Sequence, residues 1–226
     1  MPLLVQSMVV VGMWVEDLPN TRSAAIDLHK TLNTAIYQQR EKWDASIAEN
    51  VSSMCTWPIP MYQAILLHII FAFISKKPIS LGLDLKPSLQ PADSDLLAAL
   101  VRSCRRLGML QYANILARYK PGDLASYVWV GVEEVKRFNL ALFQLCRRVS
   151  SEKQSTNVEG DGPPAPTSWL LTSHELEFPV PKNDALWNAK DRKEWMDATN
   201  NMQNIGLANV MESEWIAKSA EPLLLT

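Results

Sequence analysis

The sequence predicts an all-α protein, an irregular bundle of helices in a single domain over residues 1–226. Three observations carry this prediction. Apolar residues recur at spacings of three and four in most segments, as they do on one face of an α-helix. The chain has no alternation of strand and helix patterns, no internal repeat and no extended heptad array. Its apolar share of 47% and charged share of 20% are those of a globular protein.

The first clear helical stripe lies between Ser23 and Gln39. Thr21 is the predicted N-cap of this helix, because a threonine hydroxyl can accept a backbone N–H at a helix start. The apolar positions of the stripe are Ala25, Leu28, Leu32, Ala35 and Ile36.

A second helix is predicted over the apolar run Met61–Ile74. Pro58 and Pro60 precede the run and favour a helix start, and Lys76 and Lys77 follow at the end that favours cations. The run is apolar nearly all round, which predicts a helix in the centre of the core. It is shorter than the roughly 20 residues that a bilayer span needs, so we expect no membrane partner.

The apolar segment Met1–Val15 is a poor export signal, because it lacks a basic start and an A-x-A cleavage site. We therefore expect a soluble intracellular protein.

Lys77–Pro91 is predicted to be a connecting segment. Asp93, Ser94 and Asp95 then supply caps and negative charge for the next helix. A hard-cation site at this acidic cluster is the alternative, and capping is the favoured interpretation. Gly108 is the predicted stop of the helix. Its apolar positions are Leu96, Leu97, Leu100, Val101, Cys104 and Leu107.

The longest helix is predicted over Tyr127–Val149, after a short helical segment around Tyr112–Tyr119. Glu133 lies four residues before Arg137, the favourable order for an ion pair on a helix surface. The apolar stripe consists of Val128, Val132, Val135, Phe138, Leu142, Leu145 and Val149.

Ser150–Thr167 is predicted to be a mobile loop at 150–167, because it contains one valine and no other large apolar side chain. Alternating apolar residues over 176–180 then predict an extended piece. Asp191 with Glu194 resembles a capping box that opens a short helix.

Composition and motifs exclude several classes of function. The chain has 22 Lys and Arg against 24 Asp and Glu, a net charge of −2, so it lacks the basic excess of a duplex-binding domain. No glycine loop for phosphate, nucleophile elbow or H-E-x-x-H motif is present. We therefore predict no catalytic, cofactor-binding or metal-binding residues, no cofactor, and no enzyme activity.

The three cysteines, Cys55, Cys104 and Cys146, have neither the spacing of a zinc site nor the pattern of a disulfide framework. We predict that they are small buried hydrophobic residues.

The histidines are predicted to have structural roles. His68 interrupts the apolar run and is expected to be a buried, hydrogen-bonded imidazole, with a catalytic base as the alternative. His29 borders its helix stripe and is interpreted in the same way, and His174 is expected in a solvated loop.

The tryptophans and the basic pairs also favour structural interpretations. Most tryptophans are expected to anchor packing, and a minority to line a ligand pocket. The tryptophans are Trp14, Trp43, Trp57, Trp129, Trp169, Trp187, Trp195 and Trp215. The basic pairs are expected on solvated helix faces. They are Arg105-Arg106, Lys136-Arg137 and Arg147-Arg148.

Four pieces of the chain, in this order and spacing, carry a resemblance. The first is PLLVQSMVVVGMW (Pro2–Trp14), with AAIDLHKTL (Ala24–Leu32) after it. The second is WPIPMYQAILLHIIFAF (Trp57–Phe73), and the third is SCRRLGML (Ser103–Leu110). The fourth runs from WVGVEEVKRFNLALFQL (Trp129–Leu145) to ELEFPVPKNDALWNAKDRKEW (Glu175–Trp195).

Together these pieces resemble the fungal-specific transcription factor domain, also called the xylanolytic activator regulatory region. The second piece is similar to that family's W-P-x-x-x-x-Q-x-x-L-L helix, and the third to its R-x-x-G-L/M-L turn. The fourth is similar to its W-x-x-x-E-x-x-K-R helix and its L-P-x-x-x-x-L-W-x-A-x-x-x-x-x-W segment. Val180 stands where that segment usually has Leu. The resemblance covers about residues 1–200.

The resemblance implies a helical bundle of that family's regulatory type, in a nuclear regulator of metabolic or biosynthetic genes. It implies a small-molecule effector or a co-regulator protein as partner, and it leaves a homodimer open. DNA contact would come only through a zinc module, either a six-cysteine cluster or zinc fingers, and this chain contains neither. We expect either a fragment or mis-started gene product, or a domain that works without its own DNA reader.

The alternative function is a small helical metabolite-pathway enzyme or an accessory protein that reuses this fold. Its support is the Trp, Tyr and His content near a helical pocket that the pattern would allow, and a fold does not fix a function.

Overall fold

The computed structural model describes residues 2–47, 57–75, 89–156, 169–181, 184–200 and 216. The prediction of an all-α protein is confirmed, since every regular element within these ranges is a helix. The chain divides into two compact units. The first consists of Met1–Leu107 and Leu142–Leu171, and the second of Gly108–Ala141 and Thr172–Thr226. No helix in the described ranges is long and apolar enough to cross a membrane.

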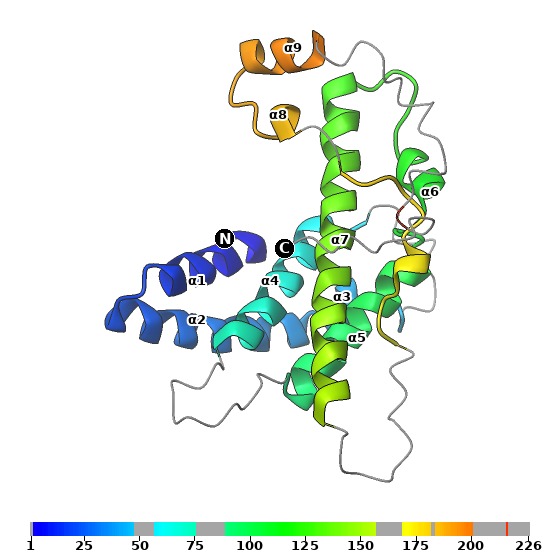
Figure 1. Cartoon of the computed structure of the whole chain (residues 1–226). Coiled ribbons are helices and arrows are strands. Elements are labelled where there is room, and N and C mark those ends of the chain that lie inside the picture. The colour runs from blue at the N-terminus through cyan, green and yellow to red at the C-terminus, as the bar shows by residue number, and fades with distance from the viewer. Residues whose placement is uncertain are drawn as a thin grey trace. The chain divides into compact units, whose positions relative to one another are not determined.

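The first unit contains the helices of the N-terminal half. Helices α1 and α2 form a hairpin whose turn includes Asp17 at a φ of 63°, and α4 packs against both (Figure 1). The helix bounds are α1 Leu3–Val15, α2 Pro19–Gln38, α3 Arg40–Trp43, α4 Ile59–Ser75 and α5 Pro91–Arg106.

Two predicted helix caps are wrong, for one reason. Helix α2 begins at Pro19 rather than after Thr21, and the Thr21 hydroxyl donates to the Leu18 carbonyl at 2.9 Å. Helix α5 begins at Pro91, so Asp93 lies in its first turn and is not its cap. Proline is favoured at the first helical position because it pre-sets φ and lacks the N–H that would stay unpaired there.

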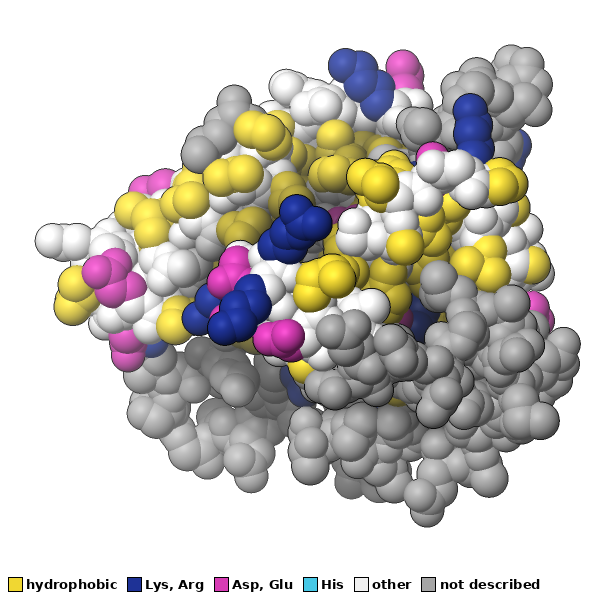
Figure 2. Space-filling model, turned by 90° about the horizontal axis from the view of Figure 1, so that it is seen from above, with side chains coloured by type: hydrophobic (Ala, Val, Ile, Leu, Met, Phe, Trp, Pro, Cys, Tyr) yellow, Lys and Arg dark blue, Asp and Glu magenta, His cyan; other side chains and the backbone are white. Residues whose placement is uncertain are grey.

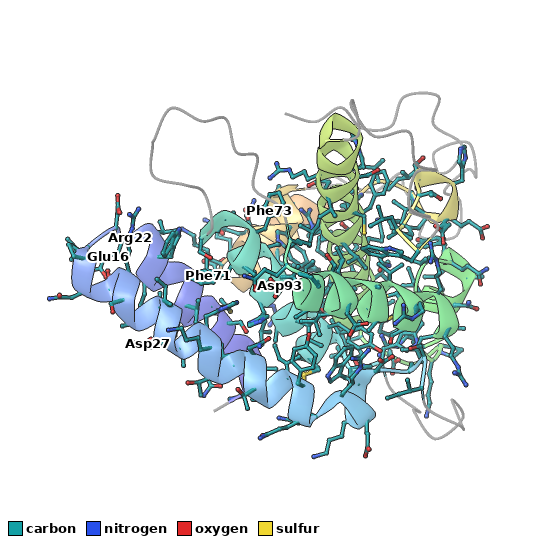
Figure 3. All side chains as sticks on the ribbon, turned by 90° about the horizontal axis from the view of Figure 1, so that it is seen from below. Glu16, Arg22, Asp27, Phe71, Phe73 and Asp93 are labelled. Carbon is teal, nitrogen blue, oxygen red and sulfur yellow. The ribbon has the colours of Figure 1, made fainter. Side chains whose placement is uncertain are left out.

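Helix α4 is the central helix of the first unit, as its apolar sequence predicts. Phe71 projects toward α1 and α2 (Figure 3), where it forms a buried cluster with Val10, Ala25 and Leu32. The buried residues of the helix are Ile59, Tyr62, Ala64, Ile65, Leu66, His68, Ile69, Phe71, Ala72 and Phe73. Lys76 and Lys77, and the connecting segment up to residue 88, lie outside the described residues.

A buried carboxylate ties α3 to α5 within the same unit. Asp44 is fully buried and accepts hydrogen bonds from Arg40 Nε at 3.0 Å and from the Ser103 hydroxyl at 3.2 Å. The Ser46 main-chain N–H also donates to it at 3.0 Å. Arg40 in turn reaches Asp95 at 2.8 Å, so these residues form one connected polar network.

The stop predicted at Gly108 is confirmed. Gly108 has a φ of +67°, in the left-handed region that favours glycine, directly after the end of α5. A Cβ at this position would overlap Asn114 Nδ2, so the Asn114 side chain would have to move to admit one.

Helix α7, Ala125–Thr156, is longer at both ends than the predicted Tyr127–Val149. Its first part belongs to the second unit and its last part to the first unit. The predicted stripe is buried from Val132 to Val149. The predicted mobile loop at 150–167 is wrong over its first seven residues, because Glu, Lys and Gln there are good helix formers and continue the helix. Residues 157–168 lie outside the described ranges.

The second unit further contains α6 (Tyr112–Leu116), the short 3-10 helix η2 (Ser173–Glu175), α8 (Asp184–Trp187) and α9 (Arg192–Asn200). The extended piece predicted over 176–180 is present. The Glu177 main chain pairs with Leu110 at 3.0 Å and with Tyr112 at 2.9 Å, and Phe178 is fully buried.

The predicted cap of α9 is present. Asp191 Oδ1 accepts the Glu194 main-chain N–H at 2.8 Å, while the Glu194 carboxylate reaches back to the Lys190 N–H rather than to that of Asp191. A capping box that the sequence analysis did not predict joins Thr172 to Glu175 at the start of η2.

Candidate functional site: a tryptophan cluster in the second unit

The best candidate site begins with four residues on one face of α7. Trp129, Glu133, Lys136 and Arg137 follow one another at spacings of four, three and one. These spacings place the four side chains on the same side of a helix with 3.6 residues per turn. Helices α8 and α9, which follow the end of α7 in the chain, bring the other members of the site.

Three tryptophans meet at this face. The rings of Trp129 and Trp195 are 5.4 Å apart at 78°, an edge-to-face arrangement, and those of Trp129 and Trp187 are 6.4 Å apart at 53°. Both geometries lie in the range that aromatic pairs prefer. Leu186 and Ala198 complete the buried part of the cluster.

Arg137 covers one face of the cluster. Its guanidinium carbon lies 4.6 Å from the Trp187 ring centre, within the distance of a cation–π contact. Trp187 keeps 39% of its surface exposed, while Trp129 is buried. The site therefore presents aromatic surface and a guanidinium to its surroundings and anchors both on a buried ring.

The charged residues below the rings are buried rather than solvated. Lys136 donates to Glu133 Oε1, and both side chains are 5% exposed. Arg137 Nε lies 3.7 Å from the other Glu133 oxygen. The Glu133–Arg137 pair expected on the helix surface therefore has a buried carboxylate, and only its Arg137 side chain, 29% exposed, reaches solvent. The expectation was wrong because α7 buries more of its circumference than one stripe, including Asn139, which donates to the Met109 carbonyl at 2.7 Å.

Burial and the nearby Glu133 carboxylate change the pKa of the Tyr112 phenol. Burial raises the pKa of the Tyr112 phenol above its usual value, and the Glu133 carboxylate raises it further. Both effects keep the hydroxyl neutral beside the buried ion pair.

The histidine predictions hold for their environments. His68 is buried and its Nε2 lies 3.1 Å from Asn33 Oδ1, so the prediction of a buried, hydrogen-bonded imidazole is confirmed. His29 is partly buried, with its Nε2 3.2 Å from the His68 carbonyl oxygen. His174 is exposed as expected, although it lies in η2 rather than in an irregular loop.

The acidic cluster and the cysteines behave as structural residues. Asp95 binds Arg40 instead of capping α5. Cys104 and Cys146 are buried free thiols, as predicted, and Cys55 lies outside the described residues. Throughout the ranges that the structure describes, no three His, Cys, Asp or Glu side chains gather in a way that could hold a metal ion.

Two of the basic pairs differ from the prediction of solvated faces. Arg105 donates to the carbonyls of Trp169 and Leu170 at 3.0 and 2.9 Å, and Lys136 is buried. Arg105 and Lys136 bond to groups of the protein rather than to water, because a guanidinium or an ammonium can donate to main-chain carbonyls or to a buried carboxylate. Arg148 is exposed, as predicted.

The tryptophans mostly anchor packing, as expected. Trp43 is fully buried and its indole N–H donates to the Ile36 carbonyl at 3.0 Å, and Trp14 packs edge-on against Phe71 at 5.3 Å. Trp187 and Trp195 are the more exposed members of the three-indole cluster around Trp129. Trp215 lies outside the described residues.

The polar partners Asn33, Asp44 and Asn139 were not predicted from the sequence. Asp44 lies outside every predicted stripe, whereas Asn33 and Asn139 directly follow the stripe residues Leu32 and Phe138. The available signal was a polar residue directly beside a predicted apolar stripe, since a polar side chain at such a place needs a buried partner.

Comparisons with known proteins found no family model, no curated protein and no solved structure that matches this chain.

Proposed function

We propose that this chain is the regulatory, effector-response domain of a fungal transcription factor that controls metabolic or biosynthetic genes. It acts without catalysis, in the nucleus, and contacts DNA only through a zinc module that this chain does not contain. Its partner is a small-molecule effector or a co-regulator protein.

One observation supports this proposal. The residues that carry the fourth piece of the resemblance lie together in the structure. Trp129, Glu133, Lys136 and Arg137 come from the W-x-x-x-E-x-x-K-R part, and Trp187 and Trp195 from the later part. These two parts are distant in sequence, and their characteristic side chains form one cluster. Packing in one cluster would account for the characteristic residues of both sequence patterns.

The chemistry of the cluster suits binding. Partly exposed indole rings and a guanidinium recognise flat rings by stacking and anionic groups by hydrogen bonding. An effector that contacts Trp187 and Arg137 would change the packing between α8 and the first part of α7, which belong to the same unit. The effector would then set the activity of the transcription factor, because it would stabilise one arrangement of α8 over another.

A reporter assay tests the proposal directly. The full chain is fused to a heterologous DNA-binding domain in fungal cells that carry a reporter with the matching operator. We expect reporter output to differ several-fold from that of the DNA-binding domain alone, and to change with the nutrient supplied. Arg137→Ala should abolish this response.

Arg148→Ala is the matched control, because it removes the same side chain from an exposed position of the same helix. It should keep the response. An expressed, folded fusion that leaves the reporter unchanged in all nutrient conditions would contradict the proposed function.

A further inference from the structure

Helix α1 has apolar residues on two opposite faces. One face packs into the first unit through Val10, Leu3 and Trp14. The opposite face carries Val5, Met8, Gly12 and Val15, at spacings of three, four and three, with Val9 beside them. The helix contains no charged residue between Leu3 and Val15. Hydrophobic side chains accordingly gather on the surface over α1 (Figure 2).

The outer face is open to solvent in a single copy of the chain. Met8 is 58% exposed and Val15 73% exposed, and Val5 and Val9 are also exposed. A helix that covers a core normally carries polar and charged residues on its far side. A contiguous apolar far side, in contrast, is the mark of a surface that associates with another.

The spacing of this face is complementary to itself. The order three, four, three is the same when it is read in either direction, so a second α1 in antiparallel orientation matches it residue by residue. Val5 then lies opposite Val15 of the second copy, and Met8 opposite Gly12. A Cβ on Gly12 would have open space beyond its own helix backbone and chain neighbours, so the long Met8 side chain meets a gap. A large residue facing a small one permits close helix packing.

The charges at the two ends of α1 favour the same orientation. The helix starts after Pro2 without a side-chain cap and without an acidic residue in its first turn. Exposed Glu16 and Asp17 follow its other end, beside Arg22 at the α1–α2 turn (Figure 3). Antiparallel pairing brings these carboxylates near the start of the partner helix, where the unpaired N–H groups favour negative charge.

We propose that the outer face of α1, formed by Val5, Met8, Gly12 and Val15, is an antiparallel interface between two copies of this chain. The contact is isologous, because each copy contributes the same surface. The helix is about 20 Å long. A face of this length is smaller than the roughly 800 Å² per partner of a stable interface, so the dimer is weak and depends on concentration. This inference does not rest on the proposed function.

Sedimentation equilibrium of the full chain, from low micromolar to several hundred micromolar, tests the interface. We expect a monomer–dimer equilibrium with a micromolar Kd. Met8→Glu should raise the Kd at least about tenfold, because it buries an unpaired charge in the interface, opposite Gly12 of the second copy. Leu124→Glu is the matched control, since it adds the same charge at a 76% exposed leucine outside α1 and should leave the Kd unchanged.

Gly12→Leu separates association from folding. The added side chain has open space in a single copy, so the thermal unfolding midpoint of dilute protein should stay the same or rise. In the dimer it occupies the place of Met8 from the second copy, so the Kd should rise at least about tenfold.

Cross-linking tests the orientation. An equal mixture of the Val5→Cys and Val15→Cys variants should form a disulfide-linked dimer on mild oxidation, at a level above that of the wild-type chain. Neither variant alone should do so. Cross-linking of each variant with itself would overturn the antiparallel arrangement. A chain that is monomeric at all concentrations, or a dimer that Met8→Glu leaves intact, would overturn the interface itself.

Discussion

The imidazole rings of His29 and His68 stack face to face, with their centres 3.8 Å apart and their planes 12° from parallel. His29 Nε2 donates to the His68 carbonyl at 3.2 Å, and His68 Nε2 lies 3.1 Å from Asn33 Oδ1. A main-chain carbonyl only accepts, so the His29 ring carries a proton on Nε2. The stack joins α2 to α4 and lies against the Phe71 ring, 4.7 Å from His29.

Phe71→Ala should destabilise the fold by about 3–5 kcal/mol, because Phe71 is almost fully buried against Trp14 and His29. His68→Leu should cost less, about 1–2 kcal/mol, since it removes one hydrogen bond and keeps the volume. Urea denaturation measures both, with Leu124→Ala as an exposed control. A cost below about 1 kcal/mol for Phe71→Ala would mean that α4 is peripheral.

Asp44→Ala should cost about 3–5 kcal/mol. It removes the acceptor that satisfies Arg40 and Ser103 inside the first unit, and it leaves their donors without that partner. Asp27→Ala is the control, because Asp27 forms an exposed ion pair with Lys30. It should change the free energy of unfolding by less than about 0.5 kcal/mol. Equal effects of the two substitutions would show that the Asp44 network contributes no more than a surface pair.

Gly108→Ala should cost about 1–2 kcal/mol, because alanine is strained at a φ of +67° and its Cβ would press on Asn114. Gly122→Ala is the matched control. A Cβ on Gly122 meets nothing within 4 Å, and its φ is not in the left-handed region. Thermal unfolding of the two variants checks the prediction, which fails if they have the same midpoint.

Stability should fall at alkaline pH. Burial raises the pKa of the Cys104 thiol above its ordinary value of 9.0, and the neighbouring Cys146 thiol raises it further. The unfolded chain therefore loses this proton at a lower pH than the folded chain. The resulting stabilisation is complete below about pH 9 and is lost as the pH rises toward the folded-state pKa. Burial raises the pKa of the Tyr62 phenol in the same direction, from 10.0.

Cys104→Ala should consequently reduce the slope of unfolding free energy against pH between about pH 9 and pH 11. Tyr127→Phe, which alters an exposed phenol, should leave the slope unchanged. The measurement is urea denaturation at a series of pH values. An unchanged slope in Cys104→Ala would show that this thiol does not titrate differently in the folded and unfolded chains.

Local signals in the sequence were enough for the helices themselves. The apolar run of α4, the stripe of α7 and the stop at Gly108 each depend on a few neighbouring residues. The spacing of the apolar residues along a helix decides which face is buried. Glycine adopts a positive φ without the strain that a Cβ causes. The caps failed at Thr21 and Asp93 because a proline nearby also marks a helix start, and sequence alone did not rank the two signals.

The contacts between distant residues were decided by the tertiary structure alone. The stacking of His29 on His68, the burial of Glu133 with Lys136, and the meeting of three tryptophans all depend on how separate helices pack. A sequence gives each residue's chemistry and its position on its own helix. It does not give the partner that a neighbouring helix supplies, and that partner decides whether a charge or an imidazole is buried or solvated.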